Sequence, residues 1–309
     1  MISDLINPFF SFHKKNTNAY HNVEVLLWIQ IYIGKHFYEQ AKLQIILITG
    51  VHIPTLWRTM QIKTDGLIIG LKKINENDRY LTILTRDSGI IYAYANGANR
   101  IKHKLCSSTS LLCYCDFVLF ENKGRYTVNS ADLNNAFFNI SHNLEKLSLA
   151  NYFFDIATTL CTPDIESGAF LRLLLNTLYF LEKDTHEMLF LKTIYEMRTC
   201  LLSGLAPDLL ACKECAVYED SQMFFSLENG NIICSNCFKN ELQKSHFFKL
   251  DADMLYVLRY IIFSKLEDLF KIKLSCEKSK ALTQITEQYL IKQTDRKFNS
   301  LDYFYSMLL

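Results

Sequence analysis

The chain has 309 residues, half of them hydrophobic, which is enough apolar material for two or three packed domains. Its formal net charge is only +1, so the molecule as a whole has no electrostatic field that attracts polyanions. Any nucleic-acid site must therefore be a local positive patch. The most apolar stretch near the N-terminus, residues 23–33, contains Glu24 and falls short of the ~20 residues that cross a bilayer. No secretory signal pattern is present either, and we expect a cytoplasmic protein without a membrane segment.

Residues 1–59 mix apolar clusters with scattered polar residues and show no sustained period, so no fold is predicted for them. Met60 is a natural starting residue. Our hypothesis is that residues 1–59 are an extension that arises from a misassigned start and not a domain. N-terminal sequencing or mass spectrometry of the native protein tests this.

Residues 60–138 alternate β-branched and aromatic runs with turn signals, which is typical of a small antiparallel β domain. Turn residues stand at 86–89, 96–97 and 121–124, and a long basic connection runs from Gly97 to Cys113. This pattern suits a five-stranded Greek-key barrel of the OB type, although an SH3-like barrel would give much the same pattern. The expected strands are Ile62–Gly70, Tyr80–Thr85, Ile90–Ala95, Tyr114–Phe120 and Arg125–Ser130.

Residues 139–309 change to helical periodicity, so the predicted fold class is α+β: a barrel followed by a helical domain. Helices are expected near 142–160, 165–182, 186–203, 251–268 and 280–292. In the fourth, Asp251 is a candidate N-cap. One apolar face of that helix is marked by Leu255, Leu258, Ile262 and Leu266.

Two CxxC pairs interrupt the helical domain within residues 206–240. Cys212 and Cys215 form the first pair, Cys234 and Cys237 the second, and eighteen residues separate them, which matches the spacing of four-thiolate zinc sites. Apolar runs at 223–225 and 232–233, with a turn at 228–231, indicate a hairpin that brings the pairs together. A closed shell of four cysteines leaves no position for water, so we expect one structural Zn²⁺ per chain. Four free cysteines in a loop, an iron site and a redox dithiol are the alternatives.

The other cysteines stand mostly among apolar residues and are interpreted as small core residues without chemistry, as expected for a chain kept in a reducing compartment. They are Cys106, Cys113, Cys115, Cys161, Cys200 and Cys276.

Several common catalytic patterns are missing from the sequence. The glycines form no GxG or GxxxxG phosphate cradle, no histidine has glutamate two residues later as a zinc deaminase requires, and there is no GxSxG. His186-Glu187 begins an HExxH motif, but Phe190 takes the place of its second histidine. These gaps favour a binding protein over an enzyme.

Positive charge gathers in the barrel segment. Between Met60 and Arg125, ten basic residues stand against six acidic ones, a net charge of +4. An OB-fold binds strands by placing phosphates along basic side chains and bases on aromatic faces, and Tyr92 and Tyr94 lie close to this charge in the sequence. The alternative is that each lysine is an ordinary solvated residue and each tyrosine a half-buried strand residue. The candidate DNA-binding residues are Lys72, Lys73, Arg79, Arg100, Lys102 and Lys104.

From Met60 onward the order of features resembles the RecO family of bacterial recombination mediators. The opening strand 60–69, the segment 81–85 with Gly89, the turn 96–100, the helix 195–209 before the CxxC pairs and the closing segment 296–301 each resemble a family motif. In the turn, Asn96 stands where the family has lysine, and Leu105 stands where a serine is usual.

The resemblance implies an N-terminal OB domain, a helical domain with an inserted zinc module, and no catalytic turnover. It also implies a nucleoid-associated protein that binds single- and double-stranded DNA and anneals complementary strands. The implied partners are RecR and the acidic C-terminal tail of single-strand-binding protein, with which family members help load recombinase. The alternatives are an RNA-binding or translation-associated protein with an OB-fold and zinc ribbon, and a zinc-stabilised enzyme.

Overall fold

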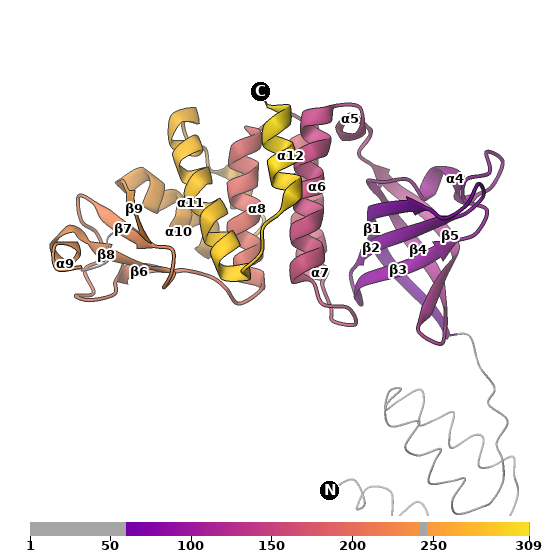
Figure 1. The fold of residues 1–309 in the computed structure, drawn as a ribbon, viewed down its shortest axis with the longest axis horizontal. Helices are drawn as coiled ribbons and strands as arrows, with labels where there is room; N and C mark the ends of the chain where they lie inside the picture. Colours follow the sequence, from indigo (N-terminus) through magenta and orange to yellow (C-terminus); the bar gives the residue numbers. More distant parts are fainter. Residues whose placement is uncertain (1–59, 242–245, 309) are drawn as a thin grey trace, which may run out of the picture. The chain divides into compact units, whose positions relative to one another are not determined.

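A computed structural model describes residues 60–241 and 246–308 (Figure 1). The hypothesis about residues 1–59 lies outside the described residues. Across the ranges that are described, no helix is both long and apolar enough to traverse a membrane.

Five strands close into a barrel in the order β1-β2-β3-β5-β4. The long first strand pairs with β4 through its first half and with β2 through its second half, while β3 and β5 run parallel and complete the closure. This topology confirms the predicted OB-fold and distinguishes it from an SH3-like barrel. The strands are β1 (Met60–Lys73), β2 (Arg79–Thr85), β3 (Gly89–Ala95), β4 (Cys113–Asn122) and β5 (Arg125–Ala136), and the short helix α4 (Leu105–Ser108) lies between β3 and β4.

The two faces of the β2–β3 hairpin differ because side chains alternate along each strand. Leu81, Ile83 and Ala93 point into the barrel core and are fully buried. On the outer face, Leu84 and Ile90 are paired across the strands and belong to the same apolar core as the helices. The helical domain therefore covers one end of this outer face.

The turn between β2 and β3 sits directly against the helical domain. Gly89 has φ of 62°, and a Cβ placed there would lie 2.2 Å from the carbonyl oxygen of Thr162. The backbone amides of Asp164 and Ser167 donate to the carbonyls of Ser88 and Arg86. A side chain at residue 89 would thus disrupt both the turn and this junction.

The helical domain is built around α8, which packs against α6, α7, α10 and α11. In Figure 1, α6 and α12 run side by side, and their residues are in contact. The elements are α5 (Phe138–Ser141), α6 (Leu144–Leu160), α7 (Gly168–Glu182), α8 (Met188–Leu202), α10 (Ala252–Phe263), the 3-10 turn η2 (Leu269–Lys271), α11 (Cys276–Thr294) and α12 (Asn299–Met307).

The fourth predicted helix is right at its start and wrong at its end. The side chain of Asp251 caps α10 by accepting from the amide of Met254 at 2.8 Å. The helix ends at Phe263, so Leu266 does not belong to it. Arg198 from α8 caps this end, because its guanidinium donates to the carbonyls of Ile261, Ile262 and Ser264, and the last carbonyls of a helix have no partner within it.

A buried polar network connects α6, α8, α11 and α12. Lys192 and Glu196 are fully buried, and their ammonium and carboxylate lie 2.7 Å apart. Glu287 lies 2.9 Å from the same ammonium, and the hydroxyl of Tyr305 donates to it. Because every charge in the network has partners, it can remain in the core.

The inserted segment folds into a four-stranded sheet of order β6-β8-β7-β9. Met223 pairs with Cys234 and Phe225 with Ile232, which confirms the predicted hairpin. A strand beyond the expected boundary, β9, joins the sheet. The elements are β6 (Asp208–Cys212), β7 (Met223–Ser226), β8 (Asn231–Cys234), the short helix α9 (Ser235–Phe238) and β9 (Phe247–Leu250).

Candidate metal centre and nucleic-acid interface

The four cysteines of the CxxC pairs meet at one point. Cys212 ends β6, Cys234 ends β8 and Cys237 lies in α9, so the sheet brings the pairs together. All four Sγ atoms lie within 4.8 Å of one another, and those of Cys215 and Cys234 are 3.6 Å apart. Sulfurs bound to one zinc at ~2.3 Å stand roughly 3.8 Å apart, so the cluster could hold a metal ion in a tetrahedral shell.

The electrostatics of the cluster favour a thiolate at Cys212. Burial works to raise the pKa of its thiol, but the backbone amides of Cys215, Cys234 and Glu214 bring that pKa down to about 7. The amide of Cys234 points at the Cys212 sulfur from 3.3 Å. Amides directed at sulfur stabilise the anionic form, which is the form that binds a metal.

Two residues outside the CxxC pairs attach this sheet to the helices. Arg259 of α10 is 8% exposed, and its guanidinium donates to the carbonyls of Leu209, Leu210 and Tyr218. Tyr289 of α11 lies so close to Gly230 that a Cβ there would be 2.7 Å from its hydroxyl. The sequence analysis missed both residues, and a buried arginine has no local signal that predicts it.

The other cysteines fit their predicted role in part. Cys113, Cys115, Cys161 and Cys200 are buried, and Cys106 is half-buried. Cys276 is exposed, so its assignment to the core is wrong. It opens α11, where its thiol donates to the carboxylate of Glu187, and the first turn of a helix commonly faces solvent.

Five of the six candidate DNA-binding residues are exposed near one end of the barrel. We name residues 96–104 the basic loop. The backbone N–H of Asn99 donates to the backbone carbonyl of Asn77, and the guanidinium of Arg100 donates to the Asn77 side chain. These two bonds fasten the basic loop to the β1–β2 turn. Lys73 precedes this turn. The exposed residues are Lys72, Lys73, Arg100, Lys102 and Lys104.

Arg79, the sixth candidate, is engaged in the protein itself. Its guanidinium donates to Asn99 Oδ1 at 2.7 Å, to the carbonyl of Cys106 at 2.9 Å, and to the carbonyl and hydroxyl of Thr109. These bonds hold the connection between β3 and β4 against the start of β2. Arg79 is therefore placed to position the basic loop, and its contact with DNA stays a prediction.

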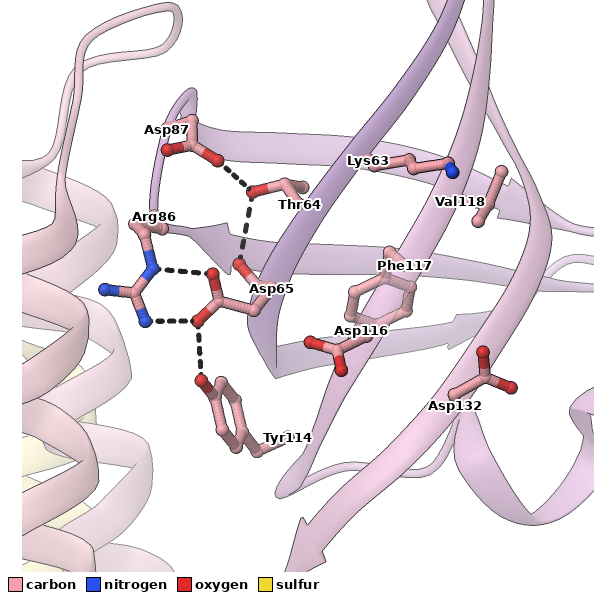
Figure 2. A pocket seen from close by; sticks show the side chains of 10 residues that line it. All are labelled: Lys63, Thr64, Asp65, Arg86, Asp87, Tyr114, Asp116, Phe117, Val118 and Asp132. Carbon is pink, nitrogen blue, oxygen red and sulfur yellow. Dashed lines mark hydrogen bonds and ion pairs between the residues drawn. The ribbon is translucent and has the colours of Figure 1, made fainter.

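A hollow of about 650 Å³ on another part of the barrel has the opposite charge (Figure 2). We name it the aspartate hollow. Lys63 and Arg86 are its only cations among the lining residues, and Arg86 is already paired with Asp65 through two bonds of 2.6 and 2.7 Å. The hydroxyl of Tyr114 also binds Asp65. The lining carries more acidic than basic side chains, which disfavours a phosphate here; its aspartates are Asp65, Asp87, Asp116 and Asp132.

The aspartate hollow contains a coupled group that the sequence did not indicate. That group is Asp65. Its hydrogen bond to Arg86, together with the one from Tyr114, lowers the pKa of Asp65 below its ordinary value, although burial opposes the shift. Burial and the same bond to Asp65 raise the pKa of Tyr114 to about 12. Asp65 is thus a charged structural anchor between β1 and the β2–β3 turn.

A third aromatic residue also escaped the sequence analysis. Tyr80 stands beside Tyr94 in the paired strands β2 and β3, and its ring lies 4.8 Å from that of Tyr94 and 6.3 Å from that of Tyr92. The alternation Tyr80, Thr82, Leu84 along β2 was the signal that could have placed it on the outer face.

Comparison with known proteins adds a family to this geometry. The family "Recombination protein O N terminal" matches residues 60–137, and "Recombination protein O C terminal" matches residues 141–302. A "DNA repair protein RecO" of Acetivibrio thermocellus is 32% identical over 242 residues, which are 78% of this chain and 95% of that protein. Its counterpart in Alkaliphilus metalliredigens is 29% identical, over 79% of this chain and 98% of that protein. A third, from Dehalococcoides mccartyi, is 29% identical over 70% of this chain and 83% of that protein.

The two matched segments follow the two structural parts described above. The first covers the OB barrel, and the second covers the helices together with the four-cysteine sheet. The chain belongs to the RecO family of DNA repair proteins.

Proposed function

We propose that this protein is a non-enzymatic, DNA-binding mediator of recombinational DNA repair. The observation that carries the proposal is the basic loop, which is fastened beside the β1–β2 turn of an OB barrel so that exposed cations gather there. Phosphates along a strand need such a row of cations, and no base-specific group is required. The aspartate hollow keeps DNA away from the β1–β4–β5 side, which gives binding a direction.

The proposal divides the chain into two working parts. Residues 60–138 form the DNA-binding domain, and residues 139–309 form the helical domain with the module 206–240. We assign the four-cysteine cluster a structural Zn²⁺, held by Cys212, Cys215, Cys234 and Cys237. With four sulfurs bound, zinc has no open position for a substrate, so its part is to hold the sheet together.

Membership of the RecO family supports a more specific proposal for the steps that follow DNA binding. We propose that the protein anneals complementary strands and, with RecR, helps load recombinase onto single strands coated by single-strand-binding protein, whose C-terminal tail it binds. The work takes place in the cytoplasm, on the nucleoid. The same membership favours DNA over RNA, and an annealing assay set against a pull-down on ribosomal RNA separates the two.

The test replaces Arg100, Lys102 and Lys104 together by alanine. We expect weaker binding to every DNA sequence and a shallower dependence of log K on log salt, by up to about 0.7 for each phosphate of a single strand that the variant no longer neutralises. The control replaces three exposed lysines of the helical domain, Lys273, Lys280 and Lys292, and removes the same charge elsewhere. If both triple variants show the same salt slope as the unmodified protein, the basic loop is not part of the site.

A further inference from the structure

We propose that Tyr80, Tyr92 and Tyr94 form a stacking platform for the bases of a single DNA strand, and that this platform makes the barrel prefer single strands to duplex. We name these three residues the tyrosine platform. The inference rests on the proposed function, because it specifies which form of DNA the barrel binds and how.

The tyrosines lie together on the outer face of β2 and β3. Tyr80 and Tyr94 are directly opposite in the strand register, and Tyr92 is one position further along the same face, opposite Thr82. The rings of Tyr80 and Tyr92 are nearly parallel, with 12° between their planes, and the ring of Tyr94 is tilted by 60° from that of Tyr80. The three rings therefore make one continuous aromatic surface.

This surface is the uncovered half of a single sheet face. Along the same rows of β2 and β3, Leu84 and Ile90 are buried under the helical domain. Tyr92 and Tyr94, by contrast, are 43% and 39% exposed. Aliphatic residues thus occupy the covered end, and rings with a polar tip occupy the open end, as a surface that meets a partly polar ligand requires.

Charge identifies the ligand as an anion that carries flat apolar groups. Lys72 of β1 is opposite Tyr80 in the register and is exposed, so a cation borders the platform. The basic loop begins directly after β3 and places further cations beyond Tyr94. A strand whose phosphates lie along these cations can put its bases on the rings. A duplex cannot, because its bases are already stacked and paired in its interior.

Cross-strand aromatic pairs also stabilise sheets, and this explains the half-buried Tyr80. It does not explain why Tyr92 and Tyr94 beside it remain exposed. A purely structural role predicts that removing Tyr92 or Tyr94 lowers stability and leaves DNA binding unchanged. The two roles therefore differ in what they predict for binding.

The experiment uses the full chain and compares Tyr92→Ala and Tyr94→Ala with Tyr92→Phe and Tyr94→Phe. Tyr303→Ala is the matched control, since Tyr303 is 50% exposed on α12. Fluorescence anisotropy with a labelled oligothymidine and with a labelled duplex gives the two affinities, each across a salt series. Thermal unfolding of every variant establishes that it is folded.

We expect each alanine variant to lose about 5- to 150-fold in affinity for the single strand, the range for one stacked base. Duplex affinity and the salt slope stay unchanged, because no charge is removed. The phenylalanine variants keep their affinity, because they keep the ring. Equal losses on both forms of DNA, or single-strand affinities like that of Tyr303→Ala, would overturn the platform.

The outcome also separates the two levels of the argument. If the unmodified protein binds neither DNA, the proposed function fails and the platform fails with it. If it binds both forms, and the basic-loop variant weakens binding while the tyrosine variants do not, the function stands and the platform alone is refuted.

Discussion

Replacing Lys192 by methionine tests the physical account of the helical core. The substitution keeps the length of the apolar stem and removes the ammonium that lies between Glu196 and Glu287. Glu196 is then left with a fully buried carboxylate and only the hydroxyls of Tyr152 and Thr286 as donors. Breaking one partner out of a buried ion pair costs about 3–5 kcal/mol, because the other charge stays in the core uncompensated.

The stability lost in Lys192→Met should depend on pH, and the structure predicts in which direction. Burial raises the pKa of Glu196 above its ordinary value, and the Lys192 ammonium opposes that rise. Without Lys192 the pKa rises further. A carboxyl whose pKa is higher in the folded than in the unfolded state destabilises the fold when the pH lies above its folded-state pKa. This destabilisation fades as the pH falls through the folded-state pKa, because the carboxyl is then protonated in the folded protein. The gap between Lys192→Met and the unmodified protein should therefore narrow on going from about pH 8 to about pH 5.

Urea denaturation across that pH range measures the gap directly. The double variant Lys192→Met with Glu196→Gln is the control, because it removes both charges and keeps an acceptor for Tyr152. It should recover most of the lost stability. A single variant within about 0.5 kcal/mol of the unmodified protein, or a gap that is the same at every pH, would refute the reasoning.

Three further predictions concern the attachments of the outer parts. Arg259→Ala should lower the free energy of unfolding by about 3 kcal/mol, because charged hydrogen bonds to three carbonyls are lost. Limited proteolysis of this variant should then cut within residues 206–250 first. If that segment resists the protease as it does in the unmodified protein, Arg259 is dispensable. Cys237→Ser should lose the bound zinc and unfold the same sheet while the barrel keeps its circular dichroism signal, and full zinc content would contradict the four-cysteine site. The lowered pKa of Asp65 stabilises the fold above its ordinary pKa of about 4, and this contribution is lost as the pH falls through the lowered value. Asp65→Asn should therefore flatten the acid side of the stability curve, and an unchanged acid side would show that the bonds with Arg86 contribute nothing there.

The features best predicted from the sequence are those set by residues close together in the chain. Alternation placed the strands of the barrel, although β1 and β5 extend further than expected, to Met60–Lys73 and Arg125–Ala136. The CxxC spacing and the turn before Asn231 predicted the hairpin and the meeting of the four cysteines. Asp251 was recognisable as a cap because a cap acts on its own helix.

What the sequence did not indicate depends on contacts between distant segments. The end of α10 is capped by Arg198, which lies on another helix. The DNA contact predicted for Arg79 stays a prediction, but the sequence did not indicate that its guanidinium donates to Asn99, Cys106 and Thr109, because only the folded loop brings those acceptors near. For the same reason the closing helix α12 was not predicted.

The contact between α6 and α12 has a consequence for how the chain is made. Phe298 meets the ring of Tyr152 edge-on at 5.6 Å, Ser300 donates to Asp155, and Phe304 is fully buried. During translation α6 leaves the ribosome long before residues 299–307 exist, so this seam remains open while the intervening helices emerge. A nascent chain that stalls before residue 299 presents the seam to chaperones and proteases. The order of synthesis therefore leaves the seam between α6 and α12 among the last contacts of the helical domain to form.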